Sequence, residues 1–178
     1  MASSRYSLNQ NKYLIDPEFE RLNYLLESHL KKHQRDCCLL LLALHTGGRA
    51  MEILNIRKRD LNEHQETVFL KGLKGSNDRE IPLKSWLFKS VNELVVNVNN
   101  RDDRVFQISY NRLRQIWQFY RPVLKSFHCL RHTFAIRLYK KTKDIRLVQV
   151  ALGHRNIANT MIYAEYVYSQ QELRRLIL

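Results

Sequence analysis

The sequence predicts a mainly α-helical domain that carries one small antiparallel β-hairpin, an α+β fold. Apolar residues recur three or four positions apart along most of the chain, which is the pattern of amphipathic helices. One stretch before the middle instead holds two short β-prone runs separated by glycine and polar residues. A length of 178 residues fits one domain, which we place at residues 16–178.

The N-terminal helices are predicted from their start signals and their apolar patterns. Residues 1–15 are polar and aperiodic, so we expect a linker without fixed structure. Asp16 and Pro17 begin a first helix, because a capping aspartate and a first-turn proline favour a helix start. Residues 35–45 form a second helix that is apolar nearly all round and is therefore expected at the centre of the domain.

The β-hairpin separates this region from a second helical region. Residues 67–70 and 79–83 are its strands, and the glycine and polar residues between them predict a loose tip. Further helices are predicted for residues 85–98, 109–120, 127–141 and 145–152. A capping box formed by Ser169 and Glu172 predicts a last helix over about residues 169–178. Its apolar side is formed by Leu173, Leu176 and Ile177.

The positive charge of the chain is large and segregated. Thirty Lys and Arg residues against 17 Asp and Glu residues give a formal net charge of +13. Between Arg104 and Ala164 the only acidic residue is Asp144. One sign of charge spread over several helices is typical of binding to a phosphate backbone. The alternative is a solvated basic face that binds nothing, and charge alone does not decide between them.

The apolar and cysteine content predicts a soluble, cytoplasmic protein. The longest apolar run, residues 37–44, is much shorter than the ~20 residues of a membrane-spanning helix, and the N-terminus lacks the layout of a signal peptide. The three cysteines include two neighbours in the chain, which do not form a structural disulfide. We therefore expect reduced thiols and no contact with a membrane.

An arginine and a glutamate follow a glycine break in the segment TGGRAMEILNI. Gly47 and Gly48 end the second helix, and Arg49 opens a short helix that places Glu52 one turn later. Glu52 can hold the Arg49 guanidinium in a fixed plane, which matters because a planar fork grips two phosphate oxygens only when its orientation is set. An ordinary surface ion pair is the alternative.

The segment HCLRH offers two interpretations. His128 and Arg131 are three positions apart on one face of a predicted helix, and two donors on one face suit a phosphate. His128 and His132 are four apart, like the metal ligands of a zinc-protease helix, but Cys129 stands where such a helix has glutamate. We therefore expect no metal, and for His132 we favour a core-facing ring or a hydrogen bond between helices.

Three more candidate residues lie in other segments. Lys74, in KGSNDREIPL, stands at the mouth of the hairpin, where a flexible ammonium can reach a cleft and donate a proton; Lys71 competes with it, and exposed lysines usually only aid solubility. His154 follows Gly153 in the turn after a helix. Tyr163 lies in a cluster of tyrosines, which are more often packing residues than nucleophiles.

Taken together, these segments resemble the catalytic domain of the tyrosine recombinase (phage integrase) family. The five segments TGGRAMEILNI, KGSNDREIPL, HCLRHTFA, LGHRNI and the one with Tyr163 occur in the family's order, and the resemblance runs from about Pro17 to the end. Tyr163 comes nine residues after His154, as in the family pattern. The resemblance implies the tyrosine recombinase catalytic-domain fold.

The resemblance also implies roles for single residues. Arg49 and Arg131 clamp the scissile phosphate, and His128 and His154 assist around it. Lys74 is the general acid and Tyr163 is the nucleophile, while Glu52 supports Arg49. The sequence departs from the pattern at Leu73, where a glycine usually precedes the lysine, and at Gly48, where a bulkier residue is common. The first departure keeps Lys71 as an alternative to Lys74, although the spacing to Pro82 and Leu83 favours Lys74.

The implied reaction cuts and rejoins DNA through a 3′-phosphotyrosyl intermediate, without metal, ATP or another cofactor. A phenol of pKa ~10 is a poor nucleophile at neutral pH, so cations must already surround the phosphate when charge develops on its oxygens. The expected partners are double-stranded DNA and further copies of the chain, as a tetramer on DNA and a monomer alone. We expect no N-terminal DNA-binding domain of the kind usual in the family, and therefore a catalytic fragment or else an unusually short natural enzyme. The alternatives are a non-catalytic DNA-binding regulator and strand relaxation like that of a type IB topoisomerase.

Overall fold

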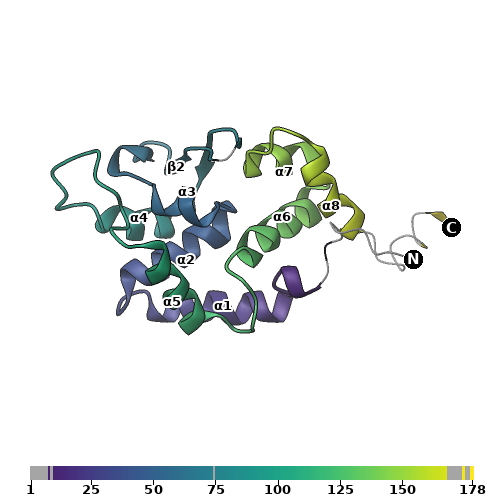
Figure 1. Ribbon diagram of the computed structural model, residues 1–178, viewed down its shortest axis with the longest axis horizontal. Coiled ribbons are helices and arrows are strands. Elements are labelled where there is room, and N and C mark those ends of the chain that lie inside the picture. The colour runs from purple at the N-terminus through teal and green to yellow at the C-terminus, as the bar shows by residue number, and fades with distance from the viewer. Residues whose placement is uncertain (1–7, 9, 74, 168–173, 175–176) are drawn as a thin grey trace.

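The computed structural model describes residues 8, 10–73, 75–167, 174, 177 and 178 (Figure 1). Its α-helices are α1 (Asp16–His29), α2 (Gln34–Thr46), α3 (Ala50–Leu54), α4 (Ser85–Glu93), α5 (Tyr110–Tyr120), α6 (Cys129–Thr142), α7 (Ile145–Leu152) and α8 (Ala158–Val167). The strands are β1 (Leu61–Asn62), β2 (Thr67–Leu70) and β3 (Arg79–Pro82), and two short 3₁₀ turns are η1 (Gln10–Lys12) and η2 (Lys58–Asp60). The predicted α+β fold is confirmed.

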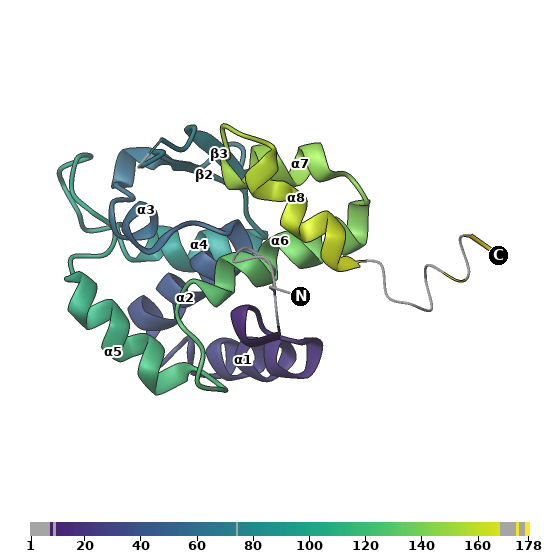
Figure 2. The same cartoon turned by 45° about the vertical axis from the view of Figure 1, so that its right-hand side comes forward.

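Helix α2 lies at the centre of the domain, as its apolar sequence predicts. Its residues from Cys37 to Leu44 are all buried, and the helix packs against α1, α4 and α6. Helices α7 and α8 pack on α6 on the side away from α2. In both views they lie at the end of the molecule opposite α4 and α5 (Figures 1 and 2). Among the described residues, none of the helices combines the length and apolarity needed to cross a bilayer.

The sheet has three antiparallel strands in the order β1-β2-β3 rather than the predicted two. Strands β2 and β3 pair in the expected hairpin, with Val68 opposite Ile81, and β1 adds to the outer edge of β2. The sequence did not predict β1 because two residues are too short to show an alternating pattern. Strand β3 also approaches α7, so the hairpin joins the sheet to the C-terminal helices.

Two helical predictions need correction. Helix α4 ends at Glu93, and residues 94–97 form turns closed by hydrogen bonds between residues three apart, instead of continuing to 98. The run of valine and asparagine there has low helix propensity, which accounts for the early end. Helix α8 was not predicted at all. It packs against both α6 and α7 while leaving Met161 42% exposed, so its apolar residues do not form one clear stripe.

The end of the predicted N-terminal linker is folded. Residues 10–12 form the turn η1, and Tyr13 and Leu14 are 4% and 3% exposed. The Leu14 N–H donates to Thr133 Oγ1 at 2.8 Å, and Lys125 Nζ donates to the Tyr13 carbonyl at 2.8 Å. Sequence periodicity missed this contact because two apolar residues are too few to form a pattern. The predicted C-terminal helix at about 169–178 lies almost entirely outside the described residues.

The hairpin loop touches the end of α7 at Gly153, where a side chain has no room. Gly153 has φ +70°, and the Asn77 N–H donates to its carbonyl at 2.8 Å. A Cβ atom on Gly153 would lie 2.6 Å from the Asn77 carbonyl oxygen and 3.1 Å from Arg79 Nη1. Gly75 has a similar φ of +80°, but no atom of the other described residues lies within 4 Å of its Cβ position. The two glycines therefore share the backbone conformation and differ only in crowding.

We expect Gly153→Ala to destabilise the domain clearly more than Gly75→Ala. The left-handed conformation costs a non-glycine residue about 1–2 kcal/mol at either site, and the clash at Gly153 adds about 1–3 kcal/mol of overpacking. Urea denaturation of both variants measures the difference in free energy of unfolding. If both variants lose the same free energy of unfolding, the hairpin loop moves away from α7 without an energetic cost, and the expected clash at Gly153 is absent.

Candidate active site

Glu52 is a fully buried carboxylate that binds the arginines of three segments. Its Oε2 accepts hydrogen bonds from the Arg49 backbone N–H at 2.9 Å and from Arg79 Nη2 at 2.7 Å, and its Oε1 accepts from Arg49 Nη1 at 3.1 Å. Arg131 Nη1 lies 3.9 Å from Oε2. Burial alone would raise the pKa of Glu52, but the hydrogen bonds from Arg79 and Arg49 and the nearby positive charges outweigh it and lower that pKa. Glu52 therefore stays ionised.

Arg49 is held as its sequence context predicts. It precedes α3 in an extended conformation, and Glu52 fixes its guanidinium while the Arg49 side chain remains 32% exposed. Arg49 Nη1 also donates to the hydroxyl of Ser76 in the hairpin loop. The alternative of an ordinary surface ion pair does not apply, because the Glu52 side chain is 0% exposed. The Arg49 guanidinium is thus partly exposed to solvent, and its orientation is fixed by the buried Glu52 carboxylate.

Arg131 is buried between the ends of two helices. It lies in the first turn of α6 at 2% exposure. Nη1 donates to the Gly47 carbonyl at 2.7 Å, and Nη2 donates to the Leu152 carbonyl at 2.8 Å. These carbonyls belong to the C-terminal ends of α2 and α7, which carry partial negative charge and favour a cation. Burial and the positive charges of Arg49 and Arg79 lower the pKa of Arg131, which nevertheless stays protonated at neutral pH.

Arg79 is a third guanidinium of the site, to which sequence analysis gave no role. Besides Glu52 it binds the Ala151 carbonyl, which accepts from Nε at 2.8 Å, while its Nη1 is buried without a hydrogen-bond partner among the described residues. The alternating pattern of β3 could have indicated this role. Arg79 and Ile81 are buried, and the residue after each of them is exposed. A charge on the core-facing side of a strand requires a buried partner.

Tyr163 is buried next to the histidine of the HCLRH segment that had no catalytic role. Tyr163 is 1% exposed, and its hydroxyl lies 2.9 Å from Nδ1 of His132. Burial raises the pKa of Tyr163 to about 12, against the lowering effect of the charges on Arg131 and Arg49. The expected hydrogen bond of His132 between helices is confirmed, and it joins α6 to α8.

The other two candidate histidines are neutral at physiological pH. His154 Nδ1 lies 2.9 Å from the Thr160 hydroxyl, which fixes its ring after the end of α7. Burial and then the charges of Arg131 and Arg49 lower the pKa of His154 to about 4. His128 precedes α6 at the surface, with its ring packed edge-on against His132 at 4.7 Å between centroids. Loss of solvent from part of its ring and the same two arginines lower the pKa of His128.

Lys74 lies outside the described residues, so its role as acid remains a prediction. Lys71, its competitor, is exposed. The loop between them and β3 reaches the site through Ser76, which accepts a hydrogen bond from Arg49. In the described part of the chain, no three His, Cys, Asp or Glu side chains are arranged to hold a metal ion.

The arrangement is suited to an anionic group of charge −1 or −2. Arg49, Arg79 and Arg131 supply three positive charges and Glu52 one negative charge, so the four together are positive by two. A phosphodiester carries one negative charge, and further charge develops on its oxygens during attack. Two imidazoles and a phenol lie within the electrostatic reach of the same arginines. The cluster of arginines can therefore bind an anion such as a phosphodiester.

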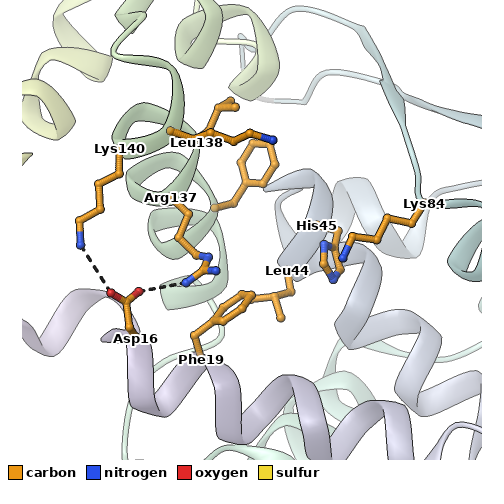
Figure 3. A pocket seen from close by; sticks show the side chains of 10 residues that line it. Asp16, Phe19, Leu44, His45, Lys84, Arg137, Leu138 and Lys140 are labelled. Atoms are coloured by element: carbon orange, nitrogen blue, oxygen red, sulfur yellow. Dashed lines mark hydrogen bonds and ion pairs between the residues drawn. The ribbon is translucent and has the colours of Figure 1, made fainter.

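A separate cavity of about 600 Å³ lies between α1, α2 and α6 (Figure 3). Phe19, Leu44 and Leu138 line it together with Arg137 and Lys84. The Arg137 guanidinium lies 3.6 Å above the Phe19 ring centre, and Asp16, at the edge of the cavity, accepts its hydrogen bond at 2.9 Å. None of the candidate catalytic residues that the structure describes lines this cavity.

The fold is that of a known family of DNA-processing proteins. The sequence matches the Phage integrase family over residues 12–170. The chain therefore belongs to this family, the tyrosine recombinases, as its motifs predict.

Several named relatives are similar to the chain. It is 28% identical over 161 residues to tyrosine recombinase XerA of Thermococcus onnurineus (strain NA1), a match that covers 81% of this chain and 57% of that protein. It is 29% identical over 188 residues to tyrosine recombinase XerC of Staphylococcus aureus, covering 95% of this chain and 62% of that protein. The chain thus spans less than two thirds of the length of these relatives.

Solved structures agree with this assignment. The XerH site-specific recombinase bound to a palindromic difH substrate, a post-cleavage complex, superimposes with a TM-score of 0.73 at 26% identity, covering 95% of this chain and 53% of that chain. The catalytic domain of bacteriophage HP1 integrase superimposes with a TM-score of 0.65 at 21% identity, covering 92% of this chain and 93% of that chain. The second match shows that the two proteins share a fold.

Proposed function

We propose that the chain is the catalytic domain of a site-specific DNA recombinase. Tyr163 attacks a phosphodiester, forms a 3′-phosphotyrosyl bond and releases a 5′-hydroxyl. Because the phosphotyrosyl ester retains the energy of the phosphodiester, attack by a 5′-hydroxyl of another strand reseals DNA without ATP. The reaction is a pair of transesterifications, and the candidate residues of its centre come from the start of α3, from β3, α6 and α8, and from the turn after α7.

Each candidate residue has a defined part in the proposed reaction. Arg49 and Arg131 bind the non-bridging oxygens and stabilise the charge that develops on them. His128 and His154 assist around the same phosphate. Lys74 donates the proton that the leaving 5′-oxygen needs, since an alkoxide is a poor leaving group at neutral pH.

The observation that carries the proposal is the position of the Tyr163 hydroxyl in the field of Arg131 and Arg49. Those two charges lower the pKa of a phenol whose burial raises it, so they act on the nucleophile as well as on the expected phosphate. The Tyr163 hydroxyl also lies 2.9 Å from Nδ1 of His132, the residue next to Arg131 in α6. The net charge of +13 supports a polyanionic substrate.

The proposed partners are double-stranded DNA and further copies of the chain. XerH, which is similar in fold and sequence, was solved bound to a difH substrate. We propose the same class of ligand here, with assembly of a tetramer on DNA. Residues 16–178 are the proposed catalytic domain, with residues 1–15 as the connection that precedes it and a tail helix at about 169–178.

A covalent-trapping experiment tests the function. A pool of duplexes with random sequence around a nick is incubated with the protein, and covalent complexes are separated on a denaturing gel and mapped to a peptide. We expect the DNA to be attached to the peptide that contains Tyr163. We also expect Tyr163→Phe to abolish the covalent complex. Tyr110→Phe, which changes a 47% exposed tyrosine on α5, is the matched control and should react normally. A complex that survives in Tyr163→Phe contradicts the proposal, and DNA binding without any covalent complex favours the regulator.

A further inference from the structure

The nucleophile needs a partner that receives its proton, and the structure supplies one outside the assigned catalytic set. His132 Nδ1 lies 2.9 Å from the Tyr163 hydroxyl. Building on the proposed function, we propose that His132 is a catalytic residue that orients the Tyr163 hydroxyl and accepts its proton during attack. From the sequence, only a packing or hydrogen-bonding role is predicted for this histidine.

Burial of the hydroxyl makes a protein acceptor necessary. Tyr163 is 1% exposed, so bulk water has little access to its proton in this state. Among the described residues, His132 is the hydrogen-bonding partner found for that hydroxyl. The contact also joins α6, which carries Arg131, to α8, which carries Tyr163. The acceptor is therefore built on the same helix as the phosphate-binding arginine.

Burial and the charges around His132 keep its ring neutral before a phosphodiester binds, so that Nδ1 can accept a hydrogen bond. Burial, followed by the neighbouring positive charges, lowers the pKa of His132 to about 3. The groups that act on it come from several elements: His128 and Arg131 from the start of α6, Lys12 from η1, and His154 from the turn after α7. With one proton on Nε2, the Nδ1 lone pair faces the phenol. A bound phosphodiester adds negative charge beside the arginines and so favours the protonated ring during attack.

The proton balance of the step is complete. The bond from Tyr163 Oη to phosphorus forms as the phenol proton passes to His132 Nδ1. The bond from phosphorus to the 5′-oxygen breaks, and the leaving oxygen takes a proton from Lys74. In the rejoining step the protonated His132 returns its proton to the departing phenolate, and Lys74 recovers its own from the attacking 5′-hydroxyl. No oxidant, metal or further reactant is needed.

Two substitutions separate orientation from proton transfer. His132→Asn keeps a hydrogen-bond acceptor near the position of Nδ1 but has no basic nitrogen, whereas His132→Leu has neither. The rate of covalent-complex formation is measured on a nicked duplex with sulfur in place of the bridging 5′-oxygen. Because a thiolate leaves without a proton, Lys74 does not limit this reaction, and the rate reports on the nucleophile.

We expect both variants to be at least about 100-fold slower than the parent at pH 7, which is the low end of the effect of general acid–base catalysis. The rate of His132→Asn should rise about tenfold for each pH unit, because attack then depends on the small fraction of phenolate, while the parent should depend less on pH. If His132→Asn reacts at the rate of the parent at every pH, the inference that His132 accepts the proton is wrong. A rate of His132→Leu equal to that of the parent overturns the whole inference.

Controls separate this inference from a folding defect and from the proposed function. His45→Asn and His45→Leu change a half-buried histidine of α2 that packs edge-on against Trp86, and they should leave the rate unchanged. If His132→Leu does not fold, the pH dependence of the rate of His132→Asn still tests whether His132 accepts the proton. A covalent complex that requires Tyr163 but not His132 refutes only this inference, whereas a complex that forms in Tyr163→Phe refutes the proposed function.

Discussion

Glu52→Gln is expected to lower the free energy of unfolding by about 3–5 kcal/mol, the cost of removing one partner of a buried charge network. The variant keeps the volume of the side chain but removes the one carboxylate that, within the described part of the chain, binds Arg49, Arg79 and Arg131. The amide nitrogen of the glutamine would also face guanidinium N–H groups. Because both groups are hydrogen-bond donors, they cannot form a hydrogen bond with each other. Urea denaturation at pH 7 measures the loss.

The pH dependence identifies the charge of Glu52 as the cause. Because the pKa of Glu52 is lowered in the folded state, its stabilising effect is present above the unfolded value of about 4.3 and is lost as pH falls through the folded value. The difference between parent and variant should therefore be full at pH 7 and shrink in acid. Glu27→Gln, on the exposed face of α1, is the matched control and should change stability by less than about 0.5 kcal/mol. A loss below about 1 kcal/mol for Glu52→Gln would contradict the network.

The sequence predicted the elements whose ends are marked locally. Helix α7 has the predicted bounds, because the Asp144 side chain accepts from the Leu147 N–H at its start and Gly153 takes the left-handed conformation after its end. Helix α8 is marked less clearly: the Asn156 side chain accepts from the Ala158 N–H at its start, but no acidic residue lies in its first turn, and its buried residues include Thr160 as well as Tyr163. What holds α8 in place is packing on α6 and α7, which a single sequence does not display.

The candidate site was predictable as a set of local motifs but not as a network. Arg49 and Glu52 are one helical turn apart, so their contact follows from spacing. The contacts of Glu52 with Arg79 and Arg131 cross 27 and 79 positions of the chain, and only the fold brings them together. The same holds for His132 and Tyr163, which are 31 positions apart. Spacing and the family resemblance thus predicted the candidate reacting groups, while the groups that contact them across the fold came from long-range contacts.

Arg131→Lys is expected to reduce the rate of covalent-complex formation by about 10²–10³-fold, as removal of one preorganised donor to a developing oxyanion does. The guanidinium of Arg131 spans the Gly47 and Leu152 carbonyls with two different nitrogens. A lysine ammonium has one nitrogen and a different reach, so it cannot bind both carbonyls and also present a fixed donor to a phosphate. The charge is kept, and the expected loss therefore comes from geometry.

Stability should fall in the same variant, because a carbonyl left unpaired in the interior costs about 1–3 kcal/mol. Arg35→Lys is the matched control, since Arg35 lies on α2, is 47% exposed and pairs with its neighbour Asp36. That control should change neither the rate nor the unfolding midpoint beyond about 0.5 kcal/mol. Measuring the rate at a temperature where both variants are fully folded separates the two effects. If Arg131→Lys cleaves as fast as the parent there, the positive charge alone suffices, and the clamp between the ends of α2 and α7 has no part in binding the phosphate.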